Sequence, residues 1–121
     1  MNASEIISQN SQQLGADPQI AVAAIAAAIK NKAAFLLQQN NSVLYIRPIG
    51  HDDAEIHLFT MDSPLVLAKS ISYFFHTLKK GHYKNFYIKE NNPQIIELLR
   101  RLRIPVTHSD KPSYNWKATT A

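Results

Sequence analysis

The sequence predicts an α/β (α+β) domain in which a mixed, mainly antiparallel sheet is packed by about three helices and preceded by an N-terminal arm. Two observations carry this prediction. A capping side chain is followed by proline at Asp17-Pro18, Ser63-Pro64 and Asn92-Pro93, which is typical of helix starts. The segments after residue 42 also contain short β-rich runs bounded by turn residues, and such runs are typical of strands.

The first 16 residues are rich in serine, asparagine and glutamine. They carry Ile6, Ile7 and Leu14 with few apolar neighbours that would bury them. We therefore predict an arm at 1–16, preceding a single domain at 17–121, and expect these three side chains to contact a partner.

A first helix is predicted to begin at Pro18 and to run to about Gln39, where Asn40 and Asn41 end it. Apolar side chains recur on one of its faces at helical spacing, and alanines form a second face. This pattern predicts a helix packed between two surfaces.

The remaining elements alternate between strand and helix patterns. Two β-rich runs, 43–49 and 54–60, are joined by turn residues and predict an antiparallel hairpin. A helix follows from Pro64 to a cap at Gly81, then a short strand at 85–89 and a third helix from Pro93. Two last strands are expected at 104–107 and 114–119.

Composition limits the classes of function. The 121 residues are 45% hydrophobic, which suffices for one core, and the absence of cysteine excludes disulfides and thiolate metal sites. A net charge of +4 allows an acidic partner. The longest apolar run, 20–29, is shorter than the about 20 residues of a membrane span, and no basic residue precedes it. We expect a protein that is neither secreted nor transmembrane.

The junction between the second strand of the hairpin and the next helix reads Met61-Asp62-Ser63-Pro64. Phosphate-binding junctions use glycines and backbone N–H groups at a helix N-terminus. Here Asp62 would repel a phosphate and Pro64 has no N–H. The junction therefore predicts no phosphate cradle.

From about Val43 onward the order of elements resembles the GNAT (Gcn5-related N-acetyltransferase) fold. The stretch "KNFYIKENNPQIIELLRRLRIPV" is the most similar: it places Asn92 at the family's asparagine and Ile95-Ile96 at its apolar pair. The resemblance implies the mixed sheet of that family.

The functional positions of the family differ in this chain. Leu99 stands where the family's general-acid tyrosine is expected, Arg103 where it has glycine, and Ile104 where it has an aromatic residue. The junction also lacks the family's Gln/Arg-x-x-Gly-x-Gly/Ala loop. We therefore assign no catalytic, cofactor-binding or metal-binding residue and expect no cofactor.

Degenerate acetyltransferase-like proteins of this kind resemble components encoded by tailed bacteriophages. The resemblance implies a non-catalytic structural or adaptor protein, located in the virion or the host cytoplasm and acting through protein–protein contacts or self-association. Two alternatives remain: a divergent acetyl-CoA-dependent N-acetyltransferase, and a small nucleic-acid-binding accessory protein.

Three further groups of side chains have the composition of possible sites. One hairpin carries histidines and aspartates, a combination that is common in polar turns without a metal, at His51, Asp52, Asp53 and His57. A basic stretch interleaved with aromatic residues is the candidate nucleic-acid contact, at Lys79, Lys80, Lys84 and Lys89. Arginines and an aromatic residue near the C-terminus are candidate partner contacts, at Arg100, Arg101, Arg103 and Trp116.

Overall fold

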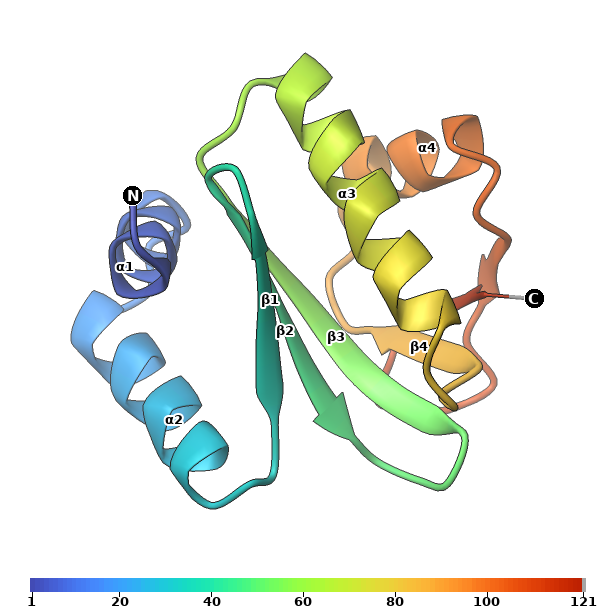
Figure 1. Cartoon of the computed structure of the whole chain (residues 1–121), viewed down its shortest axis with the longest axis horizontal. Coiled ribbons are helices and arrows are strands. Elements are labelled where there is room, and N and C mark those ends of the chain that lie inside the picture. Colours follow the sequence, from blue (N-terminus) through green and yellow to red (C-terminus); the bar gives the residue numbers. More distant parts are fainter. Residues whose placement is uncertain (121) are drawn as a thin grey trace.

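A computed structural model describes residues 1–120, and within them one six-stranded sheet lies between two pairs of helices (Figure 1). The sheet has the order β1-β2-β3-β4-β6-β5, with β3 and β4 parallel and all other neighbours antiparallel. The predicted α/β class with a mainly antiparallel mixed sheet is therefore confirmed. The strands are β1 (Phe35–Gln39), β2 (Ser42–Pro48), β3 (Asp53–Thr60), β4 (Asn85–Ile88), β5 (Val106–His108) and β6 (Trp116–Thr119).

The main core lies between the sheet and two helices, α3 (Pro64–Lys79) and α4 (Pro93–Arg101). The apolar stripe of α3 packs against the inward side chains of the strands, with Phe74 and Phe86 almost fully buried. Both helices begin at the proline that the sequence indicates, and Asn92 caps α4 by accepting hydrogen bonds from the backbone of Gln94 and Ile95.

A second core covers the opposite face of the sheet beneath α1 (Ala3–Gln13) and α2 (Pro18–Lys30) (Figure 1). A capping box between Asn2 and Glu5 begins α1. Ile6 and Ile7 are buried against Val43 of β2 and Phe59 of β3. The chain's own sheet thus buries two of the three apolar side chains of the expected arm, whereas Leu14 is 70% exposed.

The predicted helix from Pro18 to about Gln39 is wrong in its second half. Helix α2 ends at Lys30, Lys32 adopts a positive φ of 57° that turns the chain, and the next residues form β1. Asn40 and Asn41 make the tight turn between β1 and β2, with Asn40 at φ 53°. The structure consequently has four helices in residues 1–120.

Helix α2 also differs from the expected helix between two surfaces. None of its thirteen residues, Pro18–Lys30, is buried. Ala21, Val22 and Ile25 pack against the second core, and Ile20 is 69% exposed. Helix α2 therefore packs on one side only, against the second core, and its other side is exposed.

The other elements follow the sequence closely. The hairpin of β2 and β3 pairs from Ser42 opposite Thr60 to Pro48 opposite Ala54, as the predicted antiparallel pair requires. The last two strands are shorter than expected and pair with each other, and β6 also pairs with β4.

Replacing Ile6 with alanine tests whether α1 is part of the domain. Because Ile6 is fully buried against the sheet, we expect Ile6→Ala to lower the free energy of unfolding by about 2–5 kcal/mol. The exposed Leu14 provides the control, and we expect Leu14→Ala to change it by less than about 0.5 kcal/mol. Urea denaturation of both variants gives the measurement, and equal, small effects would show that α1 does not belong to the cooperative unit.

Candidate functional site

The parallel strands β3 and β4 pair over only three residues. Asp53, Ala54 and Glu55 lie opposite Asn85, Phe86 and Tyr87 in register. Beyond this point β3 continues along β2 to Thr60, whereas β4 ends at Ile88, where it pairs with β6. Within residues 1–120, positions 56–60 of β3 therefore have no strand partner on the β4 side. Alternate backbone N–H and C=O groups of this segment face the opening between the two strands.

A hollow of about 410 Å³ occupies this opening. Its walls come from both faces of the sheet: α3 and α4 contribute from one face, and Asn10 and Leu14 of α1 from the other. Eleven of the lining residues have hydrocarbon side chains and six are polar. The apolar wall includes Leu58, Ile71, Phe74, Ile88, Ile96 and Leu99.

An ion pair between His57 and Glu90 borders the hollow. His57 lies on β3, and Glu90 follows the end of β4, so the diverging strands bring the two side chains together. Burial opposes ionisation of Glu90, but the hydrogen bond and the charge of His57 outweigh it and lower the pKa of this carboxyl group. The pair uses Nδ1 of the imidazole. When the imidazole is neutral, with its proton on Nδ1 and donated to Glu90, Nε2 is the ring nitrogen that can accept a proton from a ligand.

A smaller groove of about 270 Å³ lies on the α2 side of the same ion pair. Ala24 and Ile25 of α2 form one wall, and side chains of β2, of β3 and of the segment that follows β4 form the rest. His57 and Glu90 line both the groove and the hollow. The imidazole therefore stands where the two spaces meet.

Glu55 fixes the charged wall of this groove. Its carboxylate accepts a hydrogen bond from Nε of Arg47 at 2.7 Å and lies 3.5 Å from Nζ of Lys89. Burial opposes ionisation of Glu55, but the hydrogen bond and charge of Arg47 outweigh it, and the pKa is lowered. Lys89 thus lines the groove together with the carboxylates of Glu55 and Glu90, while its own side chain is 58% exposed.

Asp62 supports the junction between β3 and α3 from within. One carboxylate oxygen accepts a hydrogen bond from the backbone N–H of Asn41 at 3.1 Å, and the other from the hydroxyl of Ser42 at 2.6 Å. The hydroxyl of Ser70 on α3 lies 3.4 Å from the same oxygen. Both serines are fully buried. The carboxylate thus ties the β1–β2 turn to α3.

The positions carried over from the family resemblance fall on the same region. Asn92 and Leu99 line the hollow, and Leu99 is only 3% exposed. Arg103 follows the end of α4 with a positive φ of 61°. This left-handed conformation is the one that favours glycine, so Arg103 holds a backbone form that a glycine would adopt more readily.

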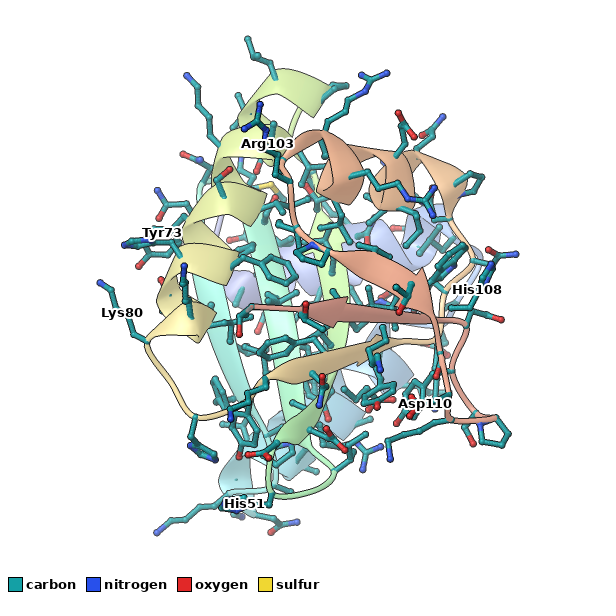
Figure 2. The ribbon with its side chains drawn as sticks, turned by 90° about the vertical axis from the view of Figure 1, so that its right-hand side faces the viewer. His51, Tyr73, Lys80, Arg103, His108 and Asp110 are labelled. Atoms are coloured by element: carbon teal, nitrogen blue, oxygen red, sulfur yellow. The ribbon has the colours of Figure 1, made fainter. Side chains whose placement is uncertain are left out.

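The basic stretch offers no exposed aromatic ring at positions 86 and 87. Phe86 and Tyr87 are buried in the sheet, while Lys79, Lys80 and Lys84 are exposed. Figure 2 shows Lys80 and Arg103 well apart on this side of the molecule, so these two side chains are not neighbours. Nucleic-acid contact stays a prediction.

Two of the four candidate partner contacts near the C-terminus, Arg100 and Trp116, form a stacked group with His108. The imidazole of His108 stacks on the indole of Trp116 with ring centres 4.6 Å apart, and the guanidinium of Arg100 lies 5.7 Å from the indole centre. The indole N–H donates to Asn91 at 3.2 Å, and Arg101 pairs with Glu97 at 3.4 Å. A partner at this group stays a prediction.

Residues 1–120 contain no group of three or more histidine, aspartate or glutamate side chains placed to hold a metal ion. None of the helices in the same residues combines the length and the hydropathy of a membrane span.

The comparison with known proteins defines the class of fold. No protein-family model matches the sequence, and no curated protein matches it. Three similar solved structures are N-acetyltransferases, and over them the chain aligns along most of its length. The chain therefore has a GNAT-like acetyltransferase fold.

The three structures share little sequence with this chain. The N-acetyltransferase from Staphylococcus aureus Mu50 gives a TM-score of 0.55 at 10% identity, covering 95% of this chain and 87% of that chain. The ribosomal-protein-S18-alanine N-acetyltransferase from Escherichia coli gives a TM-score of 0.53 at 12% identity, covering 98% of this chain and 86% of that chain. Campylobacter jejuni N-acetyltransferase PseH, in complex with acetyl coenzyme A, gives a TM-score of 0.51 at 16% identity, covering 98% of this chain and 90% of that chain.

Removing the Asp62 carboxylate tests its supporting role. Because the buried hydroxyls of Ser42 and Ser70 lose an acceptor, we expect Asp62→Ala to lower the free energy of unfolding by about 1–3 kcal/mol. Asp52 in the hairpin turn makes only a loose pair with His51 at 3.9 Å, and we expect Asp52→Ala to change stability by less than about 0.5 kcal/mol. Thermal and urea unfolding measure both, and a neutral Asp62→Ala would contradict the assignment.

The lowered pKa of Glu90 predicts a defined pH dependence. The group is deprotonated more readily in the folded chain than in the unfolded chain, where its pKa is about 4.3. Its stabilising effect is therefore complete above that value and is lost as pH falls through the lower folded pKa. We expect wild type to lose stability relative to Glu90→Gln between about pH 5 and pH 3.

Urea denaturation across this range, for both proteins, gives the measurement. His57→Gln is the control. In this background, which lacks the imidazole, the difference in free energy of unfolding caused by Glu90→Gln should no longer fall with pH in this range. Parallel stability curves for wild type and Glu90→Gln would show that the pair does not hold the carboxylate ionised.

Proposed function

We propose that this chain is a divergent coenzyme-A-dependent N-acetyltransferase. The observation that carries the proposal is the position of His57 and Glu90, where the hollow between β3 and β4 meets the groove under α2. The three N-acetyltransferases of similar fold support it, one of them solved in complex with acetyl coenzyme A. The hollow would take the acyl donor and the groove the amine.

The unpaired edge of β3 suits the pantetheine part of such a donor. Pantetheine is an extended chain with two amide groups, and residues 56–60 present alternate N–H and C=O groups toward the opening. An extended ligand can pair with such an edge as an added strand would. These backbone groups would hold the thioester in line with His57.

The reaction needs one proton acceptor, and His57 supplies it. The bound donor provides an electrophilic thioester carbonyl. The amine nitrogen forms a bond to the carbonyl carbon, the carbon–sulfur bond breaks, and Nε2 of His57 takes the proton that the nitrogen loses. Glu90 stabilises the resulting imidazolium. The thiolate takes its proton from water, because Leu99 has none to give.

The junction between β3 and α3 does not fit the pyrophosphate in the manner of the family. Asp62 fills it with a carboxylate already bound to Asn41 and Ser42, and Pro64 lacks an N–H. The proposal therefore gives the junction no part in holding the donor, and affinity for coenzyme A would depend on the opening itself.

Calorimetry and an acetylation assay test the proposal. We expect acetyl-CoA to bind the full chain and to acetylate at least one member of a panel of small primary amines. His57→Gln should lower the turnover by about 10²–10⁴-fold while the dissociation constant for acetyl-CoA changes little. The control is His51→Gln, since the His51 side chain is 92% exposed on the hairpin.

A folded protein that binds no coenzyme A thioester at millimolar concentration would refute the enzyme proposal. It would favour a second candidate, a non-catalytic structural or adaptor protein, for which a place in a phage particle is the specific form. The observation in favour of this candidate is the loss of two family features, with Asp62 used as an internal support and Leu99 buried in the hollow. Self-association in light scattering would then be the supporting result.

A further inference from the structure

The part of the hollow between the sheet, α3 and α4 is lined by hydrocarbon. Leu44, Ile71, Phe74 and Leu99 are each at most 3% exposed, yet their side chains border open space. The polar lining residues Asn10, His57, Thr60, Glu90, Asn91 and Asn92 lie on α1, on the rim strands or on the segment that leads into α4. Apolar walls of this kind bind water poorly and accept apolar groups.

The volume is large for a two-carbon acyl group. The hollow measures about 410 Å³, and cavities of about 300–1,000 Å³ hold whole drug-sized ligands. Amides of the pantetheine part would lose hydrogen bonds against hydrocarbon walls, so its place is along the free edge of β3. The hydrocarbon interior is then left for a group without polar atoms.

We propose that the acyl group carried by the donor is an aliphatic chain several carbons longer than acetyl, held between the sheet, α3 and α4. The proposal rests on the proposed function, because it concerns the donor of the same reaction. The aliphatic chain of the donor breaks no hydrogen bond of the protein when it enters the hollow. Its methylene groups contact the walls that an acetyl group leaves uncovered. The thioester stays at the opening beside His57.

Titration calorimetry with acetyl-CoA, butyryl-CoA and octanoyl-CoA tests the chain length on the full protein. A fully buried methylene group raises affinity by about fourfold, and we expect octanoyl-CoA to bind at least about tenfold more tightly than acetyl-CoA, with butyryl-CoA between them. Free coenzyme A and free octanoate are run as controls for the two halves of the ligand. We expect each to bind more weakly than octanoyl-CoA.

A matched pair of variants tests the location. Ile95 borders the hollow on α4, whereas Ile104 packs against the same core outside it, and both are half-buried. Ile95→Phe should weaken octanoyl-CoA binding by about fivefold or more and acetyl-CoA binding by less than about twofold. Ile104→Phe should change neither. Circular dichroism checks that both variants fold. If the larger side chain prevents folding, Ile95→Ala and Ile104→Ala are used as the matched pair instead.

The outcomes separate the two proposals. Equal affinities for acetyl-CoA and octanoyl-CoA would overturn the longer chain and leave the proposed acetyltransferase intact. Tight octanoyl-CoA binding that Ile95→Phe does not weaken would overturn the location, and with it this inference. Absence of binding by every coenzyme A thioester would refute the proposed function itself.

Discussion

The three-residue parallel pairing of β3 and β4 is the constraint on which the remaining structure depends. Its closed end is fixed by the side-chain amide of Asn85, which donates to Asp53 at 2.9 Å, and by the backbone N–H groups of Lys84 and Asn85, which donate to Asp52. At the other end β3 follows β2 and β4 follows β6, so the sheet opens there. Two helices then cover each face, and the opening connects the two faces.

The junction between β3 and α3 shows how a family position can change its use. A carboxylate near a helix N-terminus is favourable by itself, and Asp62 adds bonds to Asn41 and Ser42 that fix the neighbouring turn. The same charge excludes a second anion at close range. Stability of the junction and recognition of a phosphate are therefore alternatives at this site.

The sequence allowed most of the fold to be predicted and little of the candidate site. Pro64 and Pro93 start their helices because proline at the first helical position acts locally. Asn92 also caps its helix with its side chain, whereas Ser63 makes no side-chain cap hydrogen bond. The segment Phe35–Gln39 was misassigned because the pair Asn40-Asn41 ends a helix as readily as it turns a hairpin, and only pairing with β2 decides between them. The absence of a phosphate loop was visible in the sequence. The contact between His57 and Glu90 was not, because it is made only when distant segments meet at the opening in the sheet.

Helix α2, which forms one wall of the groove, is only weakly packed against the rest of the protein. None of the residues Pro18–Lys30 is buried, and Val22 and Ile25 are only half-covered by the second core. Segments with so little buried apolar area open at a free energy below that of global unfolding. Since Ala24 and Ile25 form one wall of the groove, local unfolding of α2 would remove that wall and open the groove to solvent while the sheet stays folded.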